Sequence, residues 1–132
     1  MWIASKIGFF SIVQKDAQTH IRARVKKDLE NLIEEIGIEG WSEEDLTIQE
    51  WPGADYRFRL RIHPDDLGVL FQKLAETIDY PNFKNEIHRR PDQAAKSPAY
   101  TTLWGHLHSL QERDQILPVD YQCYDLGVGR LG

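Results

Sequence analysis

The stretch that decides the fold is Tyr56-Arg57-Phe58-Arg59-Leu60-Arg61-Ile62, in which arginines alternate with apolar and aromatic residues. A shorter stretch, Ile21-Arg22-Ala23-Arg24-Val25, has the same alternation. Successive residues of a β-strand point to opposite faces, so each stretch predicts a strand with one apolar face and one arginine-bearing face. The apolar side chains are expected to point toward a helix-covered core, and if the two strands are neighbours their arginines share one surface. The arginines on the other face are Arg22, Arg24, Arg57, Arg59 and Arg61.

Two further strands are predicted, one before each arginine strand. Residues 2–14 are rich in β-branched and aromatic side chains, which predicts a strand that forms a hairpin with residues 21–25. Residues 46–51 predict the other strand. The stretch Pro52-Gly53-Ala54-Asp55 is a strong turn signal between it and residues 56–62.

Helices are predicted where apolar residues recur at helical spacing. The first ends at Gly37, the second begins at Pro64 directly after His63, and the last begins at Ser97-Pro98. A short helix carrying Phe83 and Ile87 is predicted within residues 80–90. The apolar stripes of the three longer helices are Leu29, Leu32, Ile33 and Ile36; Leu67, Leu70, Phe71, Leu74 and Ile78; and Tyr100, Leu103, Trp104, Leu107 and Leu110.

This order predicts an α+β fold, a ferredoxin-like ββαββα sandwich. The expected sheet has four antiparallel strands in the order 1-2-4-3, with two helices on one face and an extra C-terminal helix. Residues 1–113 are expected to form a single α+β domain. Residues 114–132 show no clear period and are expected to form a weakly patterned C-terminal tail.

Composition narrows the class of protein. The chain has 132 residues, 41% of them hydrophobic, which fits one globular domain. A lone cysteine, Cys123, excludes an internal disulfide, and no apolar run approaches the ~20 residues that span a bilayer. We expect a cytoplasmic protein without a membrane partner. A net charge of −5 disfavours a nucleic-acid partner but leaves room for a local basic patch.

Five arginines on one sheet face need a source of negative charge nearby, because like charges opposite one another destabilise a sheet. One interpretation is an open face that binds an anionic ligand, a nucleic acid or an acidic partner surface, with bases stacking on Phe10, Trp51 or Tyr80. A second is that the final helix covers this face and its acidic neighbours pair with the arginines. A third is a structural homodimer that buries the face. A binding or interaction module is our leading hypothesis.

A small enzyme is the alternative from another class. Its site would lie where Asp79-Tyr80-Pro81-Asn82-Phe83-Lys84-Asn85-Glu86 meets the sheet, so Tyr80, Asn82 and Lys84 join the arginines as candidate binding residues. No nucleophile–base pair, glycine-rich phosphate loop or metal-ligand spacing is visible, and His106 and His108 lie on different sides of a helix. We therefore expect no catalytic residue, no metal and no cofactor.

Several motifs together resemble a family of small uncharacterised bacterial proteins. They are Gly8-Phe9-Phe10-Ser11, Arg22-Ala23-Arg24, Asp55-Tyr56-Arg57-Phe58-Arg59, Asp79-Tyr80-Pro81-Asn82-Phe83-Lys84-Asn85-Glu86, Trp2 and the spacing of Tyr100 from Leu103-Trp104. The similarity covers roughly residues 1 to 110. It implies a bacterial cytoplasmic protein. It carries over no catalytic residue, because the family has no established activity.

Overall fold

A computed structural model describes residues 1–37 and 39–116, with side chains described as far as residue 112. The chain divides into two compact units, Met1–Ala94 and Ala95–Gly132. Each unit is treated below by itself. Cys123 and most of the predicted tail at 114–132 lie outside the described residues.

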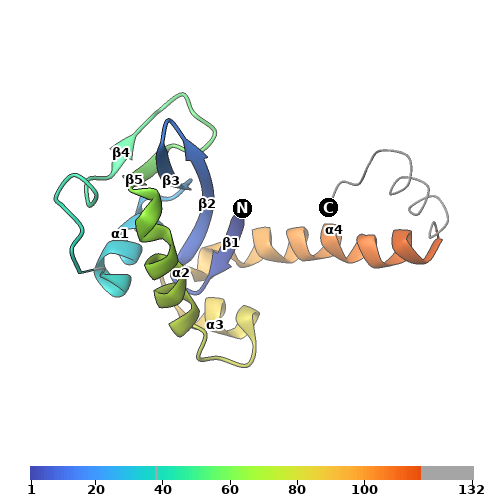
Figure 1. The fold of residues 1–132 in the computed structure, drawn as a ribbon. Coiled ribbons are helices and arrows are strands. Elements are labelled where there is room, and N and C mark those ends of the chain that lie inside the picture. Colours follow the sequence, from blue (N-terminus) through green and yellow to red (C-terminus); the bar gives the residue numbers. More distant parts are fainter. Residues whose placement is uncertain (38, 117–132) are drawn as a thin grey trace, which may run out of the picture. The chain divides into compact units, whose positions relative to one another are not determined.

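The first unit is built on a five-stranded antiparallel sheet in the order β1-β2-β3-β5-β4 (Figure 1). Its strands are β1 (Trp2–Ser5), β2 (Gly8–Lys15), β3 (Gln18–Ala23), β4 (Gln49–Glu50) and β5 (Phe58–Ile62). The α+β class is therefore confirmed. The predicted count of four strands and the order 1-2-4-3 are wrong, and the finer ferredoxin-like assignment is not confirmed.

The extra strand arises because the predicted strand at 2–14 folds back on itself as the β1–β2 hairpin. Ser5 pairs with Gly8 across a turn that holds only Lys6 and Ile7. The Ser5 hydroxyl donates to the Gly8 carbonyl at 2.8 Å and accepts from the backbone N–H groups of Ile7 and Gly8. A serine hydroxyl thus holds the turn, although no asparagine or glycine stands at its centre to indicate it.

The two arginine strands are neighbours, as predicted. Strand β3 pairs with β5 so that Ile21 lies opposite Leu60 and Arg22 lies opposite Arg59. Ile21, Ala23, Leu60 and Ile62 of these strands are fully buried in one cluster with residues of the helices, and Phe58 packs against it partly buried. The other predicted strand, residues 46–51, forms only the two-residue β4.

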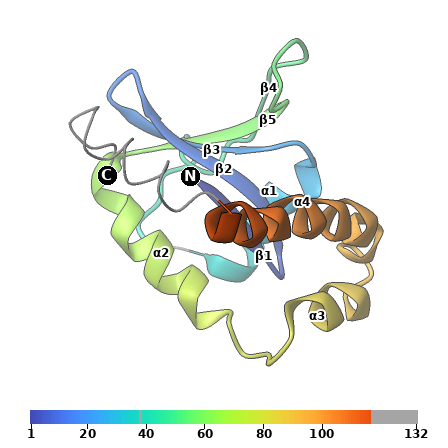
Figure 2. The same ribbon diagram turned by 90° about the vertical axis from the view of Figure 1, so that its right-hand side faces the viewer.

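Helices cover one face of this sheet (Figures 1 and 2). They are α1 (Lys26–Asn31), continued by a π-helical segment (Leu32–Ile36), and α2 (Leu67–Glu76), preceded by a 3₁₀ turn (Pro64–Asp66). A shorter helix, α3 (Phe83–Arg89), follows. Gly37 ends the first helix with φ 47°, a left-handed conformation that glycine adopts easily.

The start of α2 also follows the prediction. The His63 ring caps the 3₁₀ turn that leads into α2 by accepting from the Asp65 backbone N–H, and Pro64 is the first residue of that turn. Ile78, however, was expected in the apolar stripe and is 65% exposed. It lies beyond Glu76, the last residue of α2, so it no longer shares that helical face.

A buried polar network ties the β1–β2 turn to α1 and to the segment after α3. Asp28 accepts from the Phe9 backbone N–H and from the Gln93 side chain. Gln93 and Asn31 both donate to the Ile7 carbonyl, at 3.0 Å and 2.9 Å. These partners are distant in sequence and 2% exposed or less, so they fix three parts of the chain at one point.

The second unit contains α4 (Ser97–Ile116), which begins after a 3₁₀ turn (Ala94–Lys96). The Thr102 hydroxyl donates to the Pro98 carbonyl, and the Trp104 ring stacks on His108. Trp104, Leu107 and Leu110 of its predicted stripe are each more than half exposed. None of the helices in the described part of the chain has the length and apolar character that crossing a bilayer demands.

Candidate functional site

The face of the sheet opposite the helices carries a row of polar side chains. Ser11 lies opposite Arg22, Arg22 opposite Arg59, and Arg59 opposite Gln49, so the row crosses four strands. The side chains of Trp51 and Tyr56 contact the guanidinium groups of this row. We call the patch formed by Ser11, His20, Arg22, Trp51, Tyr56 and Arg59 the arginine face.

Arg59 is the most buried arginine, with 4% of its surface exposed. Its guanidinium carbon lies 3.7 Å from the centre of the Trp51 ring. Its terminal nitrogens lie 3.3 Å from His20 Nδ1 and 3.3 Å from the Tyr56 carbonyl oxygen. Within the described residues it has no carboxylate partner, which is unusual because buried charges are normally paired.

Arg22 is half-buried and similarly placed. It donates to the Ser11 hydroxyl at 2.7 Å, and its guanidinium carbon lies 4.7 Å from the centre of the Tyr56 ring. No ion pair joins it to an acidic residue in the part of the chain that the structure describes. The two central arginines therefore face one another with aromatic rings, hydroxyls and carbonyls around them.

The outer arginines do have acidic partners. Arg24 donates to both carboxylate oxygens of Asp55, and Arg57 donates to Glu50 at 2.7 Å. Both ion pairs are exposed, so each contributes only about 0–1 kcal/mol to stability.

Burial, together with the neighbouring positive charges, lowers two pKa values on this face. Burial is the main cause of the lowered pKa of the Arg59 guanidinium, followed by the charges of Arg22 and Arg61. Burial also lowers the pKa of the His20 imidazole below 6.5, and the neighbouring Arg59, Arg61 and Lys15 lower it further. His20 is therefore neutral at pH 7, and its Nδ1, facing a guanidinium, is the acceptor.

Hydrogen bonding on the arginine face is incomplete. Four buried side-chain atoms of the described residues on this face lack a hydrogen-bond partner. They are His20 Nε2, Arg22 Nε, Arg59 Nε and the Tyr56 hydroxyl. All four are able to donate, since His20 carries its proton on Nε2 when Nδ1 accepts. The face thus contains several buried donors that lack acceptors.

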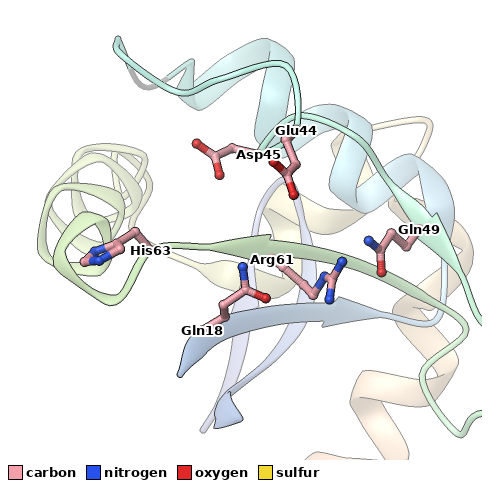
Figure 3. A pocket seen from close by; sticks show the side chains of 6 residues that line it. All are labelled: Gln18, Glu44, Asp45, Gln49, Arg61 and His63. Atoms are coloured by element: carbon pink, nitrogen blue, oxygen red, sulfur yellow. The ribbon is translucent and has the colours of Figure 1, made fainter. Parts of the chain in front are cut away.

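Arg61 lies opposite His20. Along the chain it follows Arg59 by two residues, on the other side of Arg59 from Arg57. It lines a pocket of about 210 Å³ together with Gln18, Glu44, Asp45, Gln49 and His63 (Figure 3). The five predicted arginines therefore divide into three groups. Arg24 and Arg57 form exposed ion pairs, Arg22 and Arg59 form the centre of the face, and Arg61 borders the pocket.

The predicted segment at 79–86 has mainly structural contacts. Asp79 pairs with Lys6, and the Asn82 side chain caps α3 by accepting from the Asn85 backbone N–H. The Tyr80 ring packs on Phe83, with ring centres 6.1 Å apart. Burial raises the pKa of the Tyr80 hydroxyl.

The candidate lysine of this segment, Lys84, is exposed on the first turn of α3. Glu86, near the end of the segment, accepts from Arg89 at 2.6 Å. The Lys6, Asn82 and Glu86 contacts hold α3 and the β1–β2 turn in place. They do not assemble an acid–base pair around a cavity.

Phe10 is not on the arginine face, contrary to the expectation that it would stack on bases. It is fully buried in the helix-side core, because the β1–β2 hairpin places Phe9 and Ser11 on the opposite side. Sequence analysis also missed His20, Ser11 and Tyr56 as parts of the face. The position of His20 follows from strand alternation, since it precedes Arg22 by two residues. Tyr56 lies before β5 begins at Phe58 and three residues before Arg59, so alternation does not place it on this face.

No cluster of three histidine, cysteine, aspartate or glutamate side chains suited to a metal ion occurs among the described residues. Comparisons of the chain with protein-family models, with curated proteins and with solved structures found no match.

Proposed function

We propose that this protein is a small binding module whose arginine face holds an anion with several oxygen atoms. The observation that carries the proposal is the set of unpartnered donors around Arg22 and Arg59. Two guanidinium groups lie directly opposite one another without a carboxylate partner among the described residues. An anion supplies both the negative charge and the acceptors that these groups lack.

The aromatic residues prepare the two arginines for this role. The guanidinium carbons of Arg59 and Arg22 lie over the rings of Trp51 and Tyr56, so each ring helps to hold its arginine in place. Ser11 and the Tyr56 carbonyl fix the orientation of Arg22 and Arg59. A ligand then loses little affinity to the ordering of long side chains, because they are already held.

Titration with inorganic phosphate and pyrophosphate tests the proposal. Binding can be followed by tryptophan emission, because Trp51 contacts Arg59. We expect binding that tightens as the salt concentration falls, with pyrophosphate binding more tightly than phosphate. Arg22→Gln should weaken binding at least tenfold, since it removes a charge and a fork of donors from the face.

Arg57→Gln is the matched control, because Arg57 is an exposed arginine that already has Glu50 as its partner. It should change the affinity less than about twofold. Equal losses in the two variants would show unspecific attraction to positive charge. Failure of both anions to bind at low salt would remove the basis of the proposal.

A further inference from the structure

The pocket beside Arg61 has an entirely polar lining, drawn from four parts of the chain. Gln18 starts β3, Arg61 and His63 come from the end of β5, Gln49 belongs to β4, and the acidic pair Glu44-Asp45 comes from the connection before β4 (Figure 3). No apolar side chain lines it. Its volume of about 210 Å³ is below the ~300–1,000 Å³ of pockets for drug-sized ligands. The pocket therefore suits a small, highly polar molecule.

Opposite charges border this pocket without pairing. Arg61 and Glu44 both line it, yet no ion pair within 4.0 Å joins them or joins either to another described residue. Figure 3 shows the Glu44 side chain descending from the connection toward β5, where Arg61 lies. A gap between two unpaired opposite charges is complementary to a ligand that carries both charges itself.

The neighbouring groups are held by local hydrogen bonds, which makes the arrangement definite. Asp45 accepts from the Ser42 backbone N–H at 3.0 Å, and the Ser42 hydroxyl accepts from the Asp45 backbone N–H at 3.2 Å. These reciprocal bonds fix the turn that presents Glu44. His63 Nδ1 accepts from the Asp65 backbone N–H, so a neutral His63 ring carries its proton on Nε2 and is a donor.

We infer that this pocket binds a zwitterion of the size of a free amino acid. The carboxylate of the ligand contacts Arg61, which can form two parallel hydrogen bonds with it. Its ammonium group contacts Glu44, and the carboxamides of Gln18 and Gln49 satisfy the remaining donors and acceptors. This inference stands apart from anion binding at the arginine face, because it uses other side chains and a ligand with no net charge.

The test uses the full chain labelled with nitrogen-15 and follows backbone amide shifts during titration with a panel of L-amino acids that includes serine. Lactate and ethanolamine are the comparison ligands, since lactate lacks the ammonium group and ethanolamine lacks the carboxylate. We expect at least one amino acid to bind with a dissociation constant below about 10 mM and to shift the amides of Gln18, Gln49 and Arg61. Lactate and ethanolamine should each bind at least tenfold more weakly than that amino acid.

Substitutions separate the two charges. Arg61→Gln should lower the affinity for the amino acid and for lactate alike. Glu44→Gln should lower the affinity for the amino acid and leave the affinity for lactate unchanged. Glu43→Gln is the matched control, because Glu43 is on the same turn but does not line the pocket. Arg22→Gln, which tests the arginine face, should leave amino-acid binding unchanged.

Three results would overturn the inference. They are no binding by any amino acid of the panel, equal binding of lactate and the amino acid, or an effect of Glu43→Gln as large as that of Glu44→Gln. Loss of phosphate binding in Arg22→Gln with amino-acid binding intact supports both sites. Failure of the arginine face alone leaves the amino-acid result interpretable, because the readouts and variants differ.

Discussion

Gly8 stands where the β1–β2 hairpin passes closest to α1. A Cβ atom at this position would lie 2.6 Å from Asp28 Cβ and 2.9 Å from Phe10 Cζ. Asp28 cannot yield, because its carboxylate is held by the Phe9 N–H and by Gln93. Only glycine, which has no Cβ atom, therefore fits at residue 8 without displacing the buried network around Asp28.

The first prediction concerns this contact. Gly8→Ala should lower the free energy of unfolding by about 1–3 kcal/mol or more, the usual cost of overpacking a rigid site. Gly68→Ala is the control, since residue 68 is in α2 with no atom within 4 Å of an added Cβ. It should instead raise stability by about 0.5–1 kcal/mol. Urea denaturation of both variants measures the difference, and an unchanged midpoint for Gly8→Ala would contradict the packing described.

His20 makes stability depend on pH. Its pKa in the folded protein lies below 6.5 because of burial and the charges of Arg59, Arg61 and Lys15, with Asp16 opposing them weakly. The unfolded chain binds this proton more readily, so the free energy of unfolding should fall as pH falls below about 6.5. Stability from this source is fully present above pH 7 and decreases toward the folded-state pKa.

Denaturation midpoints measured between pH 5 and pH 7 check this second prediction. His20→Gln should flatten the pH dependence, whereas His106→Gln, at an exposed position of α4, should leave it unchanged. The carboxyl pKa values that the fold lowers do not interfere. Asp79, hydrogen-bonded to Lys6, and Asp92, bonded to Asn31 and Arg90 despite its burial, titrate below 3.8. A slope that persists in His20→Gln would assign the effect to another group.

At the scale of elements, the sequence indicated structure wherever a local rule applied. Arginine alternation predicted the apolar and arginine-bearing faces of β3 and β5, Gly37 predicted the end of the first helix, and Pro64 predicted the start of the second. That β3 and β5 are neighbours was predicted from the expected strand order. The β1–β2 turn was missed because a serine side chain forms it instead of a typical turn residue. Strand β4 was predicted too long, since only Gln49 and Glu50 pair with β5.

The candidate site was predictable only in part, for a similar reason. Alternation alone placed Arg22 and Arg59 on one face. The acids that pair with Arg24 and Arg57 were not predicted, because Asp55 and Glu50 reach them through the tertiary course of the β4–β5 hairpin. The pocket at Arg61 depends on a turn that precedes β4 by several residues. No local pattern specifies which strand such a turn will approach.

Helix α4 provides the third prediction. Its apolar stripe was expected to bury Trp104, but that side chain is 55% exposed and stacks on His108 of the same helix. Trp104→Ala should therefore lower the free energy of unfolding of the protein by about 1 kcal/mol or less, not the ~3–5 kcal/mol of a buried aromatic. Chemical denaturation measures it. A loss above about 3 kcal/mol would show that Trp104 is part of a core.

On the scale of the whole molecule, the described core belongs to the first unit. Its buried apolar cluster runs from Ile7 to Leu74. The buried polar network closes within the same unit, through Gln93. The arginine face and the pocket also consist of residues from this unit, so both candidate sites rest on one framework of strands.

The order of the strands in the sheet implies an order of folding. Strands β1, β2 and β3 are joined by two short turns, whereas β5 reaches β3 only after the chain has closed the long connection from Ala23 to Phe58. Contacts between sequence neighbours form at lower entropic cost. We therefore expect the three-stranded meander to be structured in the transition state and β5 to join it later.

Ala17 makes this order measurable, because it and Asp16 form the β2–β3 turn with φ 61° and 53°, a strained conformation for residues other than glycine. Ala17→Gly should relieve that strain and act mainly by accelerating refolding. Ile62→Val, in the late-joining β5, should act mainly by accelerating unfolding. Stopped-flow measurements across denaturant concentrations give both rates. The opposite pattern in the two variants would mean that the connection from Ala23 to Phe58 closes and β5 pairs with β3 before the meander of β1, β2 and β3 forms.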